Sequence, residues 1–301
     1  MITKRAARPG ELPKAGAAPA ILIALFFTLA PILLILAYSF LSQGPSGSGA
    51  TLPITFDNYE RLLFQQDFYG NSFFDPRYLS VIGTSFAQAA TTMLVCLLIG
   101  FPTALWIAMQ PPKRQTVLIL LVSLPFWTNV LVRVYAWILL LNNKGVINGA
   151  SETLGFGVHQ LLYTNFASTI GLIYSFLPFM ILPLHAALSG FDFRLAEAAY
   201  DLGAGKFTVM RRIILPAAKG GLISGILLVL IPAFGSFIQP VLLGGGKVLL
   251  VGNLIEAQFG IARNWPFGAA LSILVLALLL VGLMVVSVAA RRTGTTVEVK
   301  L

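Results

Sequence analysis

Long apolar runs alternate with short polar stretches along the whole chain, and this alternation predicts its architecture. A helix needs about 20 apolar residues to cross a hydrocarbon layer of about 30 Å. Six runs reach that length, at residues 19–42, 80–108, 115–141, 165–189, 219–243 and 268–290. The pattern therefore predicts an all-α, polytopic membrane protein with six transmembrane helices.

Composition and charge agree with this prediction and give it an orientation. Hydrophobic residues form 57% of the chain and charged residues 10%, which excludes an ordinary soluble domain. Fourteen of the 20 Lys and Arg residues fall on the side of the two termini and of the loop at 190–218, and five on the other side. Because basic loops stay inside, we expect both termini and this loop to be cytoplasmic. The net charge of +9 is then a matter of orientation and gives no reason to expect nucleic acid as a partner.

The domain organisation follows from the same pattern. We expect a cytoplasmic tail at 1–18, a membrane domain at 19–290 and a second cytoplasmic tail at 291–301. The first apolar run is too long for the core of a cleaved signal peptide, so we expect it to remain as a span. The outer segment at 42–78 is predicted to begin flexibly and to continue as a short amphipathic helix around Phe56, Tyr59 and Leu62.

The cytoplasmic loop at 190–218 has the spacing of a short docking helix. Asp192 is placed to cap the start of this helix, Gly203 to end it in a left-handed turn, and Pro216 to force a break before the next span. An apolar stripe with helical spacing is formed by Leu195, Ala198, Ala199 and Leu202. Small residues at its centre would let a partner protein approach the backbone closely.

Prolines and glycines interrupt several predicted spans, which favours a pathway or a moving part over a passive anchor. They are Pro102, Pro125, Pro178, Pro183, Pro232, Gly235 and Pro240. For any one of them taken alone, the general abundance of Pro and Gly in membrane helices is the better explanation.

No residue pattern indicates catalysis, a cofactor or a metal site; the two histidines, His159 and His185, have no further ligands at suitable spacing. Arg133 is the ionisable residue placed within a span, and it could be structural or could line a pathway. Polar and aromatic residues near it and in the fifth span complete a candidate pathway. The set is Trp127, Asn129, Arg133, Tyr135, Ser236 and Gln239.

The loop also resembles the cytoplasmic signature of the permease subunits of bacterial binding-protein-dependent ABC importers. The resemblance rests on Glu197, Ala198, Ala199, Gly203, Ile213, Leu215 and Pro216. It implies a type I (MetI-like) fold in the bacterial inner membrane and a coupling helix that inserts into the ATPase. The residues it implies for coupling are Leu195, Glu197, Ala198, Ala199, Leu202, Gly203, Ile213, Leu215 and Pro216. It further implies a second permease, a dimer of ATP-binding subunits and an outer solute-binding protein as partners. ATP and magnesium would be used by the ATPase, so this chain would not itself be an enzyme.

Further segments look like the first permease of the spermidine/putrescine branch of this family, which implies a polyamine substrate. These segments are Asp57–Tyr59, Pro125–Thr128, Leu131–Trp137, Leu177–Leu184 and Arg263–Ala270. Ser236 and Val241 stand where polyamine permeases commonly have acidic residues. The substrate could therefore be another amine, an opine, a phosphonate or ferric ion. Alternatively, partner proteins supply the carboxylates that a polyamine pathway needs. Outside this family, the alternatives are a secondary transporter, for which we find no acidic relay in the spans, and a membrane anchor without transport.

Overall fold

A computed structural model describes residues 14–44, 49–66, 72–247 and 249–292, and most of them are helical. The chain forms two compact units, Met1–Phe73 with Ala257–Leu276 and Phe74–Glu256 with Ala277–Leu301. Among the described residues, five helices are long and apolar enough to cross a membrane, or six if a bent pair of helices counts as one span. The prediction of an all-helical, multi-span protein is confirmed at this level.

The first unit joins a long apolar helix to small strands. Helix α1 (Lys14–Ser39) leads into β1 (Leu41–Gln43), which pairs antiparallel with β2 (Ala50–Ile54). A second two-stranded sheet is formed by β3 (Phe64–Gln66) and β4 (Ser72–Phe74). The short helix predicted in this segment is present only as the single turn α2 (Asp57–Glu60).

Side-chain hydrogen bonds and a ring contact hold this turn against the end of α1. The side-chain amide of Asn58 donates to the carbonyls of Ser39 and Leu41, at 3.0 and 2.8 Å. The hydroxyls of Ser39 and Tyr59 lie 2.8 Å apart, and the ring of Phe40 packs against that of Tyr59. This segment is therefore tied to the end of α1 instead of lying free as a surface helix.

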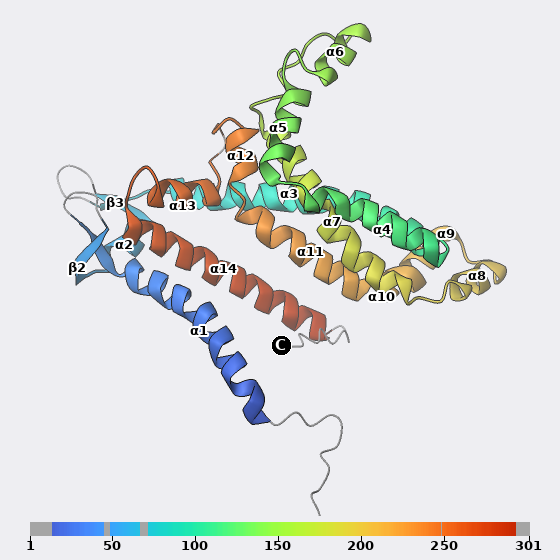
Figure 1. Cartoon of the computed structure of the whole chain (residues 1–301), viewed down its shortest axis with the longest axis horizontal. Coiled ribbons are helices and arrows are strands. Elements are labelled where there is room, and N and C mark those ends of the chain that lie inside the picture. Colours follow the sequence, from blue (N-terminus) through green and yellow to red (C-terminus); the bar gives the residue numbers. More distant parts are fainter. Residues whose placement is uncertain (1–13, 45–48, 67–71, 248, 293–301) are drawn as a thin grey trace, which may run out of the picture. The chain divides into compact units, whose positions relative to one another are not determined.

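Three long helices form the core of the second unit: α3 (Arg77–Ala108), α7 (Asn165–Ser189) and α11 (Lys219–Phe234) (Figure 1). Glycines let them approach closely. A Cβ atom added at Gly225 would lie 2.8 Å from Sδ of Met180, and one added at Gly100 would lie 2.9 Å from Cγ of the same side chain. Gly221 faces the backbone of α7 even more tightly, against the carbonyl oxygen of Pro183. The fully buried Met180 thus fills the space that glycines leave on both neighbouring helices.

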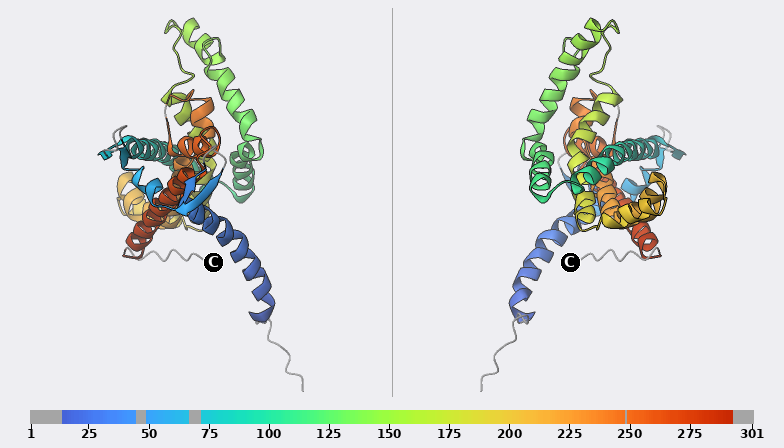
Figure 2. Two further views of the ribbon diagram at one scale, coloured as in Figure 1. Left: turned by 90° about the vertical axis from the view of Figure 1, so that its left-hand side faces the viewer. Right: turned by 90° about the vertical axis from the view of Figure 1, so that its right-hand side faces the viewer.

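The predicted third span is wrong as a single helix. It consists of α4 (Pro112–Trp127) and α5 (Val130–Leu141), separated by Thr128 and Asn129. The Thr128 hydroxyl donates to the carbonyl of Pro125 at 2.8 Å, and Asn129 Oδ1 accepts from the Leu131 amide at 2.8 Å, so side chains satisfy the helix ends at the break. Helix α6 (Val146–Thr153) follows, and Val130–Thr153 together is long and apolar enough to span. Figure 2 shows α5 and α6, in green, leading away from the three core helices as an arm.

The predicted fifth span is also interrupted. Helix α11 ends at Phe234, and a short α12 (Ile238–Leu242) begins after a non-helical stretch at 235–237. The Asn253 side-chain amide, from α13 (Val251–Phe259), donates to the carbonyl of Phe237 at 3.0 Å and so satisfies a backbone group that the break frees. The remaining long helix is α14 (Trp265–Arg292). The helices predicted at 19–42, 80–108, 165–189 and 268–290 are confirmed with shifts of a few residues.

Candidate functional site

The predicted docking helix exists as α8 (Arg194–Asp201). Asp192 Oδ1 accepts a hydrogen bond from the amide of Arg194 at 3.1 Å, at the start of the helix. At its end Gly203 has φ of 82°, a left-handed conformation that favours glycine, and the amide of Ala204 donates to the carbonyl of Ala199 at 2.9 Å. Both predicted helix ends are therefore confirmed.

The two faces of α8 differ in burial. Ala196 is buried, and Ala199 packs half-buried against the core shared with α3 and α7. Leu195, Ala198 and Glu197 are exposed, and Leu202 just beyond the helix is 89% exposed. The predicted apolar stripe is thus wrong at Ala199, which lies toward the core, while the other three members face outward.

The rest of the loop is fixed to the core but presents one further apolar side chain. It continues through α9 (Lys206–Val209), a π-helix η1 (Met210–Ile214) and α10 (Leu215–Ala217). Val209 and Ile214 are buried and Ile213 packs against the same core, whereas Leu215 and Pro216 are exposed. Phe207 is 76% exposed and was missed by the sequence analysis, although an aromatic residue in an otherwise polar loop is itself a signal.

Helix geometry continues past Pro216, so the predicted break comes two residues later. The amide of Ala218 still donates to the carbonyl of Ile214 at 2.9 Å. The segment Lys206–Ala217 then meets α11 at an angle of 72°. The π-helix η1 lies one turn before this bend, and single π-helical turns occur frequently at functional sites.

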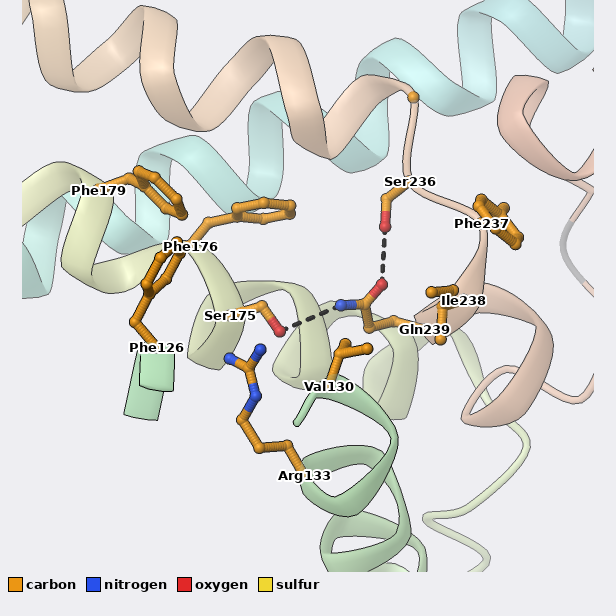
Figure 3. A pocket seen from close by; sticks show the side chains of 11 residues that line it. Phe126, Val130, Arg133, Ser175, Phe176, Phe179, Ser236, Phe237, Ile238 and Gln239 are labelled. Carbon is orange, nitrogen blue, oxygen red and sulfur yellow. Dashed lines mark hydrogen bonds between the residues drawn. The ribbon is translucent and has the colours of Figure 1, made fainter. Parts of the chain in front are cut away.

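A cavity of about 330 Å³ opens where the breaks of the third and fifth predicted spans come together (Figure 3). It is lined by Phe126, Val130, Arg133, Ser175, Phe176, Phe179, Gly235, Ser236, Phe237, Ile238 and Gln239. Of the six candidate pathway residues, the structure brings together Arg133, Ser236 and Gln239.

The other three candidates lie elsewhere. Trp127 is 83% exposed, Tyr135 is exposed on α5, and Asn129 caps that helix. Val241 is exposed and does not line the cavity, in contrast to Ser236. Half of the candidate residues therefore line one cavity, and the pathway role itself stays a prediction.

A short chain of hydrogen bonds crosses the polar side of the cavity. The Ser236 hydroxyl donates to Gln239 Oε1 at 2.7 Å, and Gln239 Nε2 donates to the Ser175 hydroxyl at 3.1 Å. Gln239 is 4% exposed, so these bonds stabilise a buried amide that links α12 to α7. Ser175 was missed by the sequence analysis because a single serine in an apolar helix gives no sign of the direction in which it points.

Aromatic rings form the opposite side of the cavity. Phe126 and Phe179 make an edge-to-face contact with centroids 5.1 Å apart, and Phe176 lies 6.2 Å from Phe179. Such rings can contact methylene groups or, through their faces, an organic cation. The guanidinium of Arg133 points between this aromatic side and Ser175 (Figure 3). The cavity could therefore hold a slender amphipathic molecule, with one fixed positive charge at its wall.

Comparison with known proteins places the chain in a family. Residues 97–294 match the family described as binding-protein-dependent transport system inner membrane component. The chain is similar to the spermidine/putrescine transport system permease protein PotB of Haemophilus influenzae, with 46% identity, covering 83% of this chain and 84% of the relative. It is 41% identical to PotB of Escherichia coli K12, over 82% of this chain and 86% of that protein.

A solved structure shares the fold. It is the crystal structure of a bacterial alginate ABC transporter in complex with an alginate pentasaccharide-bound periplasmic protein. One of its chains superposes with a TM-score of 0.73, covering 94% of each chain at 18% identity. The apolar helices, the matched family region and the extensive identity to permeases agree, and the chain belongs to the family of binding-protein-dependent transport system inner membrane components.

Proposed function

We propose that this protein is a membrane-spanning permease subunit of an ATP-driven importer that moves a polyamine, spermidine or putrescine, into the cell. The substrate assignment is supported by the identity of 41 to 46% to PotB proteins over more than four fifths of the chain. The cavity is compatible with it, because aromatic faces suit both the methylene segments and the ammonium groups of a polyamine.

The loop around α8 is the surface that would receive the force of ATP hydrolysis. Leu202 and Phe207 project from it, while Ala196 and Val209 anchor the same loop in the core of α3 and α7. A partner that grips the exposed side chains would therefore move the core helices as well. This anchored but exposed loop is the observation that chiefly supports coupling to an ATPase.

The complete machine would contain four kinds of subunit. This chain would pair with a second, related permease, and two ATP-binding subunits, which use ATP and magnesium, would bind the α8 loops from the cytoplasm. A periplasmic or extracellular binding protein would deliver the substrate to the outer side. Both termini would lie in the cytoplasm, and the cavity would open alternately to the two sides of the membrane.

Uptake of labelled putrescine and spermidine by vesicles that hold this chain with its genomic neighbours tests the proposal. We expect uptake that requires both ATP inside and the binding protein outside. ATP hydrolysis stimulated by the binding protein with another ligand, and no polyamine uptake, would refute the substrate but keep the permease role.

A matched pair of leucine variants tests the coupling loop. Leu202→Ala should weaken binding of the ATPase at least about tenfold, because burying a leucine is worth about 1.5 to 3 kcal/mol and 1.4 kcal/mol is tenfold. Leu154→Ala removes another well exposed leucine, at the end of α6, and should leave ATPase binding unchanged. Equal ATPase binding by the two variants, measured by co-purification at graded concentrations, would contradict the coupling role.

A further inference from the structure

Arg133 brings a positive charge into the cavity, and the described part of the chain does not compensate it. Its Nε atom is buried and has no hydrogen-bond partner. It also has no ion-pair partner among the described residues. The side chain as a whole is half-buried, and leaving a buried donor of a guanidinium without a partner is unfavourable.

The polar neighbours of Arg133 do not supply the missing charge. Ser236 and Gln239 are bonded to each other, and Gln239 in turn donates to Ser175. All three side chains are neutral. The eleven residues that line the cavity include no Asp or Glu. The carboxylates nearest to Arg133 along the sequence are those of Asp75 and Glu152, and neither lines the cavity. Asp75 pairs with Arg77, and Glu152 is exposed on α6.

The unpaired charge of Arg133 would oppose the passage of a polycationic substrate. Like charges repel each other, and most strongly beside apolar walls such as those of this cavity, so a polyamine would avoid a pathway whose wall carries an unpaired guanidinium. A negative group from another protein would remove that obstacle. A carboxylate suits best, since its two oxygens match the planar fork of arginine.

We propose that Arg133 forms an ion pair with a carboxylate of the second permease subunit across the translocation pathway. This inference rests on the proposed function, which supplies the second permease and the cationic substrate. The pair gives the carboxylate two competing cations, the fixed guanidinium and an arriving ammonium group of the polyamine. The empty pathway is then closed by the ion pair, and the substrate opens it by replacing Arg133 at the carboxylate.

Crosslinking in the assembled importer tests the contact directly. In an Arg133→Lys variant, a membrane-permeant carbodiimide activates a carboxylate, and an adjacent lysine amine displaces the resulting urea to form an amide. We expect a covalent link between this chain and the second permease, and mass spectrometry will identify the carboxylate. An Arg61→Lys variant, which changes an exposed arginine in the first unit, is the control and should give no such link. A link from position 133 to lipid or to the binding protein, or no link, would overturn the proposal.

Charge reversal tests the function of the pair. Arg133→Glu should lower the initial rate of polyamine uptake at least about tenfold, equivalent to about 1.4 kcal/mol, while the complex still co-purifies. Exchange of the crosslinked carboxylate for Arg in the same complex should restore uptake to within about threefold of wild type. Arg61→Glu should have little effect. Wild-type uptake by Arg133→Gln, or failure of the reversed pair to restore transport by an assembled complex, would overturn the proposal.

The two proposals fail in distinguishable ways. If the wild-type complex does not transport polyamines but the crosslink to the second permease forms, the ion pair stands and the substrate assignment fails. If the wild-type complex transports polyamines but the crosslink does not form, the substrate assignment stands and the ion pair fails.

Discussion

Two adjacent glycines of α11, Gly220 and Gly221, offer a matched test of how the core helices are packed. A Cβ atom added at Gly221 would clash with the carbonyl oxygen of Pro183 and would lie 2.7 Å from the Cβ of Ala187. A Cβ atom added at Gly220 would meet nothing within 4 Å. Both changes to alanine make the same gain in helix propensity, at most about 1 kcal/mol, so this contribution cancels when the two variants are compared.

The difference between them then measures the clash. The backbone oxygen on α7 cannot turn aside as a side chain would, so α11 must shift, and overpacking of this kind costs about 1 to 3 kcal/mol. Gly221→Ala should therefore be less stable than Gly220→Ala by about that amount. One or two kcal/mol corresponds to a factor of about 5 to 30 in the ratio of folded to unfolded protein.

Thermal unfolding of the two variants in the same detergent, followed by size-exclusion chromatography of the remaining folded protein, would measure this difference. Gly220→Ala should melt at or slightly above the wild-type temperature and Gly221→Ala clearly below it. Equal melting of the two variants would show that α7 and α11 do not approach each other this closely at Gly221.

Three further predictions concern single polar or loop positions. Gln239→Leu removes the hydrogen-bond partner of the Ser236 and Ser175 hydroxyls and should destabilise the protein by about 1 to 3 kcal/mol, which lowers the melting temperature. An unchanged melting temperature would contradict the chain of hydrogen bonds. The hydrogen bond from Arg77 holds the pKa of Asp75 below its ordinary value. The contribution of this hydrogen bond to stability should therefore be constant above about pH 5 and should disappear as the pH falls below about 4. The difference in melting temperature between wild type and Asp75→Asn should shrink only in that acidic range. Gly203→Asp should reduce co-purification of the ATPase, while the chain is still inserted in the membrane. Gly190→Asp is the control, because Gly190 lies in the same loop but has no left-handed φ, and it should leave co-purification unchanged. Normal transport by Gly203→Asp would show that the coupling assignment is wrong.

The hydropathy pattern was sufficient for the helices that cross the bilayer without interruption. α3, α7 and α14 lie where long apolar runs predict them, because a run of that length leaves the backbone no other way to satisfy its hydrogen bonds in lipid. The breaks were not placed by the same argument. Thr128 and Asn129 end one helix and start another through specific side-chain bonds, which an average over 20 residues does not register.

The candidate sites show the same division between local and tertiary information. Asp192 and Gly203 could be assigned from sequence because capping depends on residues a few positions apart. Ser175 and the orientation of Ala199 could not, because they depend on how each helix is rotated against its neighbours. Arg133 was recognised as unusual, but its unpaired Nε could be found only once its surroundings were known.

The glycine contacts around Met180 have a consequence for spectroscopic studies of transport. A side chain held against Gly100 on one helix and Gly225 on another prevents α3, α7 and α11 from sliding or turning past one another without opening the core. The three helices should therefore travel as one rigid block, as in a domain rotation and not as a shear of packed helices. Distances between spin labels on any two of them should stay constant through the transport cycle, so labels that report the motion must be placed with one member outside this block.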